Sequence, residues 1–496
     1  KLASYVCKIC VAARIRMLLY TTSSKISSQK ESQMSSMTTH DNLVDDILTN
    51  DGREILDDEL SSPVFSNLAE IDALLPAFSR REVRFGPVLG VGASGVVREV
   101  KNIDLLDVTQ CSFSTFKTSL STNSGNDSVE NDFQSESDND NVNERELENL
   151  NYHFSSRNGL ASLCQRNGEA RYAVKSLMLE DACAEQQARA RIDLAIEVSY
   201  LKVLSHPHIV KIRGSLNTSN LFDPKFFFLM DRLYGTLHDK IGEWNQSLGK
   251  KNIDVMRFVL KPFRGTKNYN WNREFMKERL FVAHDIASAF NYMHKNKVIH
   301  RDIKKQNIGF DIRGNVKVFD FGLAKSLREH RLSYCDYYNL TANVGSIPYM
   351  APEVALGKPY NEKCDVFSFG ILLYEIICLK PPFSMAVKQN YTRVVAKGGK
   401  RPRIKNKWPS MTKEIMKSSW MSSPFARPSM GNICRMIKGD LQELETEEKI
   451  ASRIECIGDI SRHSSSRFCN LDQTALKEST HEISFHSSSL DECNEK

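Results

Sequence analysis

The sequence predicts an α+β protein with a small β-rich N-terminal lobe, a larger and mainly helical C-terminal lobe, and disordered termini and insertions. Hydrophobic residues make up 41% of the 496-residue chain and concentrate between about residues 83 and 440. Short runs rich in β-branched and aromatic residues come first, and runs with helical periodicity follow. The length alone would allow about three domains, but long polar stretches leave fewer.

Charge and cysteine content restrict the possible classes. A formal net charge of +6 is mild and does not imply nucleic-acid binding. No segment reaches about 18 uninterrupted apolar residues, so we expect no membrane span.

Twelve scattered cysteines without an evident secretory signal indicate reduced thiols, and the isolated pair Cys7 and Cys10 predicts no metal site. We therefore expect a cytoplasmic protein, with a nuclear location as the alternative. The oligomeric state is not set by the sequence.

Residues 1–79 are predicted to be a disordered N-terminal region. The first 30 residues hold six Lys or Arg and no acid, which is typical of a transit peptide or, as we favour, of a disordered basic tail. Because the chain begins with Lys1 rather than Met, we expect its start to be incomplete. Residues 21–79 are rich in Ser, Thr and Asp. Their short apolar runs allow one or two weak helices but no packed domain.

Residues 83–101 predict a β-hairpin around a glycine-rich turn. Val96 and Val97 follow the turn directly, which favours a strand over the helix expected in a dinucleotide-binding fold. Glycines at such a turn let backbone N–H groups approach phosphates. The predicted phosphate-covering residues are Leu89, Gly90, Val91, Gly92, Ala93, Ser94, Gly95 and Val97.

Residues 102–168 are predicted to be a disordered acidic insertion between two strands. Between Cys111 and Asn143, 18 of 33 residues are Ser, Asn or Asp. Such a segment cannot bury enough apolar area to offset the entropy that it would lose on ordering. A docking segment that orders on binding, or a set of phosphorylation sites, is the alternative. A second polar, basic insertion is expected at residues 244–271, and residues after about 460 are predicted to be a disordered tail.

Ordered elements lie between these insertions. Residues 171–175 predict a strand that carries Lys175, and residues 185–204 predict a helix that carries Glu197. Glu197 is the expected partner of Lys175, with the shorter Asp193 as a competitor. Residues 209–212 and 226–230 predict two further strands, and the long helix 273–296 leads to His300.

The chemistry concentrates in His300-Arg301-Asp302-Ile303-Lys304-Lys305-Gln306-Asn307, followed by Asp320-Phe321-Gly322. This set suits phosphoryl transfer: Asp302 for the attacking hydroxyl, Lys304 for the transferred phosphate, and Asn307 and Asp320 for metal ions. With the glycine-rich hairpin and the Lys175 strand, it resembles the catalytic signature of eukaryotic protein kinases. The resemblance covers about residues 83–440. It implies an N-lobe at 80–233, a C-lobe at 234–440, and a helix remnant with a tail at 441–496.

The resemblance implies ATP and Mg²⁺ as ligands. Lys175 would pair with the α/β-phosphates. Met230 would guard the back of the adenine pocket, and backbone groups of Asp231 and Leu233 would bond to adenine. Ala173 belongs to the same site. Gly309 departs from the family, which usually has an aliphatic side chain under the adenine. The floor is therefore thinner, or Ile308 and Phe310 compensate.

The activation segment runs from Asp320 to Glu353 by the same resemblance. Arg301 would bind a phosphorylated loop, with Thr341 as the first candidate site and Ser333, Tyr334, Tyr337 and Tyr338 as alternatives. Asp365 would hold the catalytic-loop backbone, and Glu353 would pair with Arg427. His300, Phe321 and Gly322 have structural roles.

By the same resemblance, Ser346 falls where Ser/Thr kinases usually carry a Thr that touches the catalytic Asp. Together with Lys304 it favours Ser/Thr specificity, and residues 365–430 resemble the tyrosine-kinase-like group. We therefore expect a Ser/Thr kinase acting on protein substrates and controlled by an upstream kinase. A pseudokinase or scaffold is the alternative class, but such proteins usually lack at least one of Lys175, Glu197, Asp302, Asn307 and Asp320. A dual-specificity kinase stays open. Six basic residues between 397 and 407 predict a solvated face, with a nuclear signal or an acidic-substrate patch as alternatives.

Overall fold

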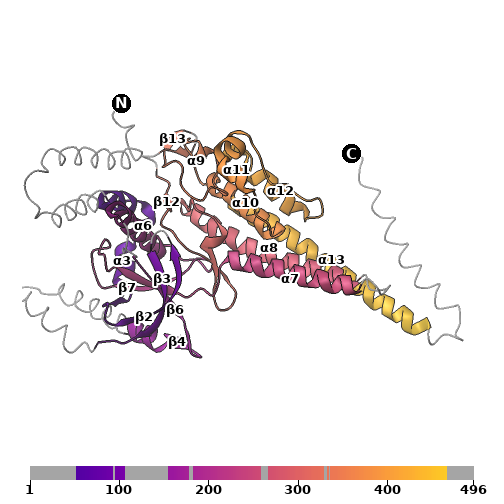
Figure 1. Cartoon of the computed structure of the whole chain (residues 1–496), viewed down its shortest axis with the longest axis horizontal. Coiled ribbons are helices and arrows are strands. Elements are labelled where there is room, and N and C mark those ends of the chain that lie inside the picture. Colours follow the sequence, from indigo (N-terminus) through magenta and orange to yellow (C-terminus); the bar gives the residue numbers. More distant parts are fainter. Residues whose placement is uncertain are drawn as a thin grey trace, which may run out of the picture.

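The computed structural model describes residues 52–92, 95–106, 155–177, 183–258, 266–328, 332–334 and 336–465. Two lobes are visible in Figure 1, a sheet-containing N-terminal lobe and a helical C-terminal lobe. The predicted α+β architecture is therefore confirmed. None of the helices in these ranges is long and apolar enough to span a membrane.

The N-terminal lobe is a six-stranded sheet with the order β1-β7-β8-β6-β3-β2. All neighbouring pairs are antiparallel except β1 and β7, which are parallel. The strands are β1 (Ala77–Phe78), β2 (Val83–Gly92), β3 (Gly95–Ile103), β6 (Tyr172–Ser176), β7 (Ile212–Leu216) and β8 (Phe227–Asp231). The expected hairpin is thus β2–β3. The strand expected at 209–212 lies further along the chain, since β7 begins at Ile212 and Ile209 forms only an isolated bridge to Val318 of the other lobe.

Helix α6 (Ala184–Val203) belongs to the same lobe, close to where the sequence predicted a helix. Its apolar residues join one large core that continues into the C-terminal lobe. A second, smaller core includes Val83, Val100, Tyr172 and Phe227. The sheet therefore holds Lys175 of β6 within reach of α6.

The N-terminal region expected to be disordered is in fact packed between residues 52 and 79. A helix at 52–60, the 3₁₀ turn η1 (Pro63–Phe65), α3 (Leu68–Leu74) and β1 occupy it. The prediction failed because the short apolar runs, which look too weak to form a domain alone, bury Leu56 and Phe65 in the main core. Residues 1–51 lie outside the described ranges.

Part of the first insertion is also ordered. Residues 155–162 are helical, and β4 (Gln165–Arg166) pairs with β5 (Glu169–Ala170). Arg157 forms an ion pair with Glu82, and Cys164 is buried in the smaller core. These contacts anchor the end of the insertion to the sheet, whereas residues 107–154 lie outside the described ranges.

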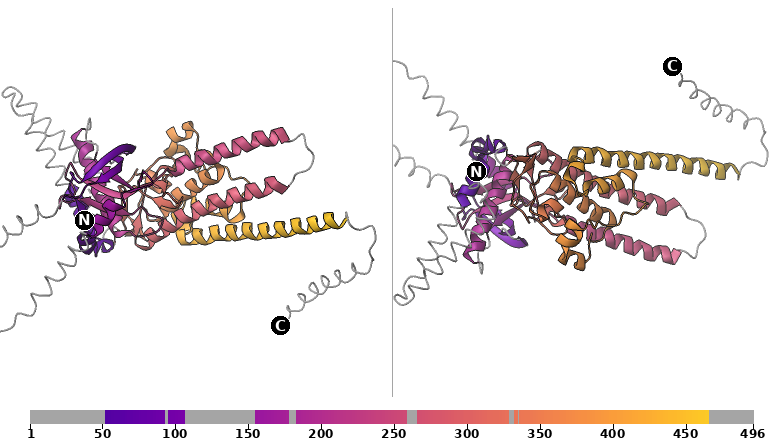
Figure 2. Two further views of the ribbon diagram at one scale, coloured as in Figure 1. Left: turned by 90° about the horizontal axis from the view of Figure 1, so that it is seen from below. Right: turned by 90° about the horizontal axis from the view of Figure 1, so that it is seen from above.

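The second insertion is helical on both sides of its undescribed centre, which corrects the expectation of disorder there. Helix α7 (Leu237–Phe258) enters it, and α8 begins at Thr266 rather than at 273 and ends at Lys295. With α13 (Met430–Ser465), these helices extend away from the N-terminal lobe in both views of Figure 2. Packing of α13 against α8 includes ion pairs from Arg273 to Glu447 and from Lys277 to Glu448.

Short elements between α8 and α13 carry the functional loops. They are β9 (Val298–Ile299), the 3₁₀ turn η2 (Lys305–Asn307), β10 (Ile308–Phe310), β11 (Val316–Val318), β12 (Lys325–Ser326), β13 (Leu332–Tyr334), β14 (Tyr337–Tyr338), α9 (Pro352–Ala355), α10 (Lys363–Cys378), α11 (Met385–Gln389), the π-helical turn η4 (Thr392–Lys397), α12 (Ser410–Ser419) and the 3₁₀ turn η5 (Pro424–Ala426). Helix α10 is buried along nearly its whole length, so it forms the centre of this lobe.

Candidate functional site

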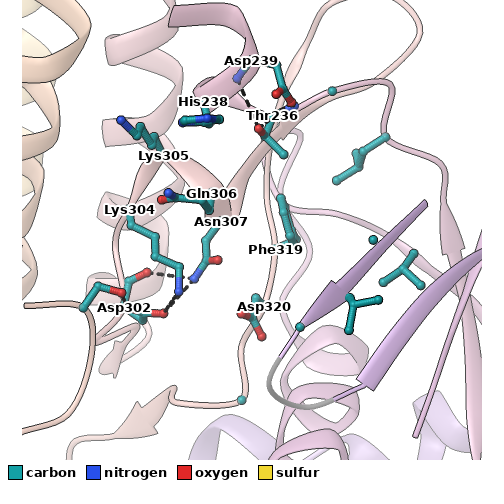
Figure 3. Close-up of a pocket in the computed structure, with 18 of the residues that line it drawn as sticks. Thr236, His238, Asp239, Asp302, Lys304, Lys305, Gln306, Asn307, Phe319 and Asp320 are labelled. Atoms are coloured by element: carbon teal, nitrogen blue, oxygen red, sulfur yellow. Dashed lines mark hydrogen bonds and ion pairs between the residues drawn. The ribbon is translucent and has the colours of Figure 1, made fainter. Parts of the chain in front are cut away.

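Three side chains hold the Asp302 carboxylate, and two of them, Lys304 and Asn307, are labelled in Figure 3. Lys304 Nζ lies 2.6 Å from Oδ2, and the Asn307 amide donates to the same oxygen at 3.1 Å. The Ser346 hydroxyl donates to Oδ1 at 2.8 Å. Asp302 itself is 7% exposed, so its orientation is fixed by these contacts. A carboxylate fixed in this way can accept or orient the proton of an attacking hydroxyl.

Asp365 of α10 supports the backbone of this loop. Its carboxylate accepts the N–H groups of His300 and Arg301, each at 2.9 Å, and contacts His294 at 3.0 Å. Burial alone would raise the pKa of Asp365, but the His294 contact and the backbone donors lower it below its ordinary value. The ionised carboxylate therefore ties the catalytic loop to the buried central helix, which is the contact that the sequence predicted.

Lys175 joins the N-terminal lobe to the Asp-Phe-Gly segment. Its ammonium lies 2.5 Å from Glu197 and 3.6 Å from Asp320. Burial alone would lower the pKa of Lys175, but these two carboxylates raise it. The predicted partner Glu197 is confirmed, while Asp193 lies one turn earlier and lines the same cavity. The charged lysine is therefore placed beside the metal-binding candidate Asp320.

Asn307 and Asp320 provide oxygen ligands of the kind that hard divalent cations prefer. Because the Asn307 amide nitrogen donates to Asp302, its oxygen is the atom that remains for a cation. Asp320 adopts a left-handed backbone conformation with φ of 68°, uncommon outside glycine and typical of constrained functional residues. Among the described residues, no group of three or more His, Cys, Asp or Glu forms a metal cage.

A cavity of about 1090 Å³ lies between the two lobes. Its lining includes most of the predicted nucleotide site: Leu89, Gly90, Val91, Gly92, Gly95, Val97, Ala173, Lys175, Met230 and Leu233. The carboxylate of Asp231 pairs with Arg213 on β7, at 2.7 and 2.9 Å, while the predicted role of its backbone groups stays a prediction. Ala93 and Ser94 lie outside the described residues. The cavity has a size and composition that suit a nucleotide.

The sequence did not identify several other lining residues. Phe319 precedes Asp320 directly, so its position was a usable signal. Thr236, His238 and Asp239 come from the start of α7, where Thr236 donates its N–H to the Asp239 carboxylate at 2.8 Å. That capping contact fixes the helix start at the rim of the cavity. The pattern Thr-x-x-Asp before an apolar residue was the available signal.

Leu233 explains the glycine at position 309. A Cβ at 309 would lie 2.6 Å from Leu233 Cδ1 and 3.3 Å from Leu233 Cβ. The two backbone segments also approach closely, since Thr236 and Gly309 form an isolated bridge. Leu233 therefore takes the space that a side chain at 309 would need, which differs from the expected compensation by Ile308 and Phe310.

Arg301 is linked to the activation segment through Tyr360. Its Nε donates to the Leu323 carbonyl at 2.6 Å, and one terminal nitrogen donates to the Tyr360 hydroxyl at 3.3 Å. Tyr360 in turn donates to the Thr341 carbonyl at 2.7 Å. The first candidate phosphorylation site is thus near Arg301. Of the other candidates, Ser333 is exposed, Tyr337 is half-buried and Tyr338 is buried, while the side chain of Tyr334 is not described.

The predicted pair of Glu353 and Arg427 is confirmed as a bidentate ion pair. The two guanidinium nitrogens lie 2.6 and 2.8 Å from the carboxylate oxygens, and both residues are buried. Phe321 is fully buried and its ring packs against His300, with centroids 5.2 Å apart. Gly322 lies against α6, where a Cβ would approach Asp193. The residues that the sequence predicted to be structural are therefore held by packing and ion-pair contacts.

Comparison with known proteins gives a consistent result. The protein kinase domain family matches residues 157–437, more than half of the chain. The serine/threonine-protein kinase STY17 of Arabidopsis thaliana is 35% identical over 279 residues, which cover 56% of this chain and 42% of that protein. The serine/threonine-protein kinase CTR1 of the same plant is 30% identical over 272 residues, or 54% and 28% of the two chains. A probable LIM domain-containing serine/threonine-protein kinase of Dictyostelium discoideum is 37% identical over 160 residues, or 32% and 23%. The matched region thus spans less than half of each relative.

Proposed function

This chain belongs to the protein kinase family, and we propose that it is an ATP-dependent protein serine/threonine kinase. The observation that carries the proposal is the fixed Asp302 carboxylate, held by Lys304, Asn307 and Ser346 in the lining of the cavity. The N-terminal lobe supports it with the Lys175–Glu197 ion pair. The relatives, all named as serine/threonine-protein kinases, support the same specificity.

The family uses ATP with a divalent metal, and we propose Mg²⁺. Asn307 and Asp320 would hold the metal, which neutralises charge on the phosphates when bound. Lys175 would orient the nucleotide, and Lys304 would face the phosphate being transferred. Asp302 would orient the substrate hydroxyl and receive its proton. The β2–β3 hairpin would cover the phosphates and exclude water.

We further propose that phosphorylation of the activation segment by an upstream kinase controls activity. The chain of bonds from Arg301 through Tyr360 to Thr341 supports this. A phosphate at Thr341 would bring a dianion toward the Arg301 guanidinium, an interaction that orders such segments. Replacing Thr341 by Ala should abolish the rise in activity after treatment with a broadly specific activating kinase. An equal rise in the variant would contradict this site.

The central test uses the full chain with Mg-ATP and a generic protein substrate, beside Asp302→Asn. Transfer to Ser and Thr, lost by at least about a thousandfold in the variant, is expected because Asp302 orients the nucleophile. The substitution keeps the shape of the side chain, so nucleotide binding should remain. Equal nucleotide binding by both proteins without transfer by either would instead establish a pseudokinase. Phosphotyrosine on the substrate would establish dual specificity.

A further inference from the structure

The segment before the glycine-rich hairpin carries a buried acid that the proposed catalytic machinery does not include. Glu59 lies in the last turn of the helix at 52–60 and is 1% exposed. A buried carboxylate is costly unless charged groups and hydrogen-bond donors compensate it. The residues that compensate Glu59 therefore indicate what this segment does.

The partners of Glu59 come from two separate functional elements. Its Oε1 accepts the Tyr200 hydroxyl of α6, and also the Ser326 N–H at 2.6 Å and the Ser326 hydroxyl at 2.7 Å. Its Oε2 forms an ion pair with Lys325 and lies 3.5 Å from Arg328. Tyr200 lies about one helical turn after Glu197, and β12 follows Asp320 closely. One side chain thus joins the helix of Glu197 to the start of the activation segment.

Further contacts surround this junction. The ring of Phe65 packs on Tyr200 with centroids 5.0 Å apart, and both residues are buried. Arg328 donates to the Ser61 hydroxyl at 2.6 Å and lies 3.5 Å from Asp58. Helix α3 and η1 lie against α6, as Figure 1 shows for α3. The segment therefore contacts α6 along one side and β12 at its end.

Burial alone would raise the pKa of Glu59, but Lys325, Tyr200 and Ser326 lower it below its ordinary value. The carboxylate is therefore ionised at neutral pH, and removing it would take a buried counter-ion from Lys325 and a hydrogen-bond acceptor from Tyr200. Antiparallel pairing of β12 with β9, next to the catalytic loop, depends on the same residues. Loss of Glu59 would thus remove contacts from both α6, which carries Glu197, and β12, which follows Asp320.

We propose that residues 52–78 are an intramolecular positioning element in which Glu59 locks α6 to β12 and so fixes Glu197 and Asp320 in the arrangement needed for transfer. This inference rests on the proposed kinase function. Glu59 is a positioning residue, because it touches neither the nucleotide cavity nor the reacting groups. A signal that detached this segment would switch the kinase off without altering any residue of the cavity.

The test compares full-chain Glu59→Ala with Glu70→Ala, an exposed acid on α3 of the same segment. At a temperature where circular dichroism shows both to be folded, Glu59→Ala should lower kcat by at least about tenfold. Its KM for the protein substrate should stay within about twofold of the control, because the substrate-facing surface is unchanged. Hydrogen exchange should become faster in residues 191–203 and 320–328, but not in α10.

Two outcomes would overturn the proposal: a kcat equal to that of Glu70→Ala in folded protein, or faster exchange throughout the chain, which would indicate general loss of stability. If Glu59→Ala does not fold, Glu59→Gln keeps the shape and the acceptor for Ser326 and serves for the same comparison. Hydrogen exchange does not depend on activity. If wild type and control transfer no phosphate, the kinase function fails, while local exchange still tests the Glu59 junction.

Discussion

At the scale of single residues, Leu233 and Gly309 together shape the floor of the nucleotide site. Leu233 fills the space beside Gly309, so a methyl group at 309 must displace it. We predict that Gly309→Ala raises KM for ATP several-fold, consistent with an overpacking cost of about 1–3 kcal/mol. The rate at saturating ATP should change little, because Asp302 and its partners are not touched.

The matched control for this pair is the double variant Leu233→Ala with Gly309→Ala. It removes the displaced atoms while leaving one methyl group at 309, so much of the ATP affinity should return. Steady-state kinetics over a range of ATP concentrations measures both variants. If the loss of ATP affinity in the double variant equals the sum of the losses in Gly309→Ala and Leu233→Ala alone, the two positions act independently and the explanation by Leu233 is wrong.

Asp193 makes stability depend on pH. Burial chiefly, opposed by Arg189, raises the pKa of Asp193 from 3.8 to about 6. A raised carboxyl pKa means that the folded state binds this proton more firmly than the unfolded state does. The stability that the protonated Asp193 contributes is therefore lost as the pH rises through about 6. Asp193→Asn should therefore be more stable than wild type at pH 7.5, by up to about 3 kcal/mol, and much closer to it at pH 4.5.

Thermal unfolding of ligand-free protein at the two pH values measures this effect. The comparison is made within each pH, which cancels contributions from other titrating groups. A difference in Tm between the Asp193→Asn variant and wild type that is the same at pH 4.5 and 7.5 would rule out titration of Asp193 as the cause. No nucleotide is added, because its phosphates would change the field at this carboxyl group.

At the scale of elements, Glu353 and Arg427 join α9 to the turn η5 that precedes α13. Arg427 is 2% exposed, and its loss would leave the Glu353 carboxylate buried without its cation. We predict that Arg427→Met costs about 3–5 kcal/mol in the free energy of unfolding. The double variant Glu353→Gln with Arg427→Met should lose less, since no charge is left unpaired. Denaturant unfolding measures both, and an equal loss in the two variants would contradict the ion-pair explanation.

Elements with a local signal could be predicted from the sequence, and elements that depend on distant partners could not. The hairpin β2–β3, the strand of Lys175 and α6 each carry their pattern within one short stretch. Residues 52–79 do not, because Glu59 meets Ser326 across 267 positions. The same limit applies to Gly309, because the side chain that excludes a Cβ there is Leu233, which lies 76 positions earlier in the connection between the lobes. The catalytic residues were predictable because their short motifs resemble those of protein kinases.

At the scale of the whole molecule, the cavity is lined by both lobes, so a bound nucleotide connects them. The metal candidates Asn307 and Asp320 belong to the C-terminal lobe, whereas the glycine-rich hairpin and Lys175 belong to the N-terminal lobe. A ligand that binds only the folded protein stabilises it by about 2.7 kcal/mol at a hundred times its Kd. We predict that ADP with Mg²⁺ raises Tm by several degrees.

Removal of the metal should show how much of this rise in Tm depends on Mg²⁺. With EDTA present, ADP should raise Tm less, because the diphosphate charge then meets Asp320 without a cation between them. In Asp320→Asn the Mg²⁺-dependent increment should shrink, while the metal-free increment stays or grows because one repulsive charge is gone. Differential scanning fluorimetry of the two proteins, with and without Mg²⁺, measures all four values. Equal increments with and without Mg²⁺ in wild type would show that Asn307 and Asp320 do not hold the metal.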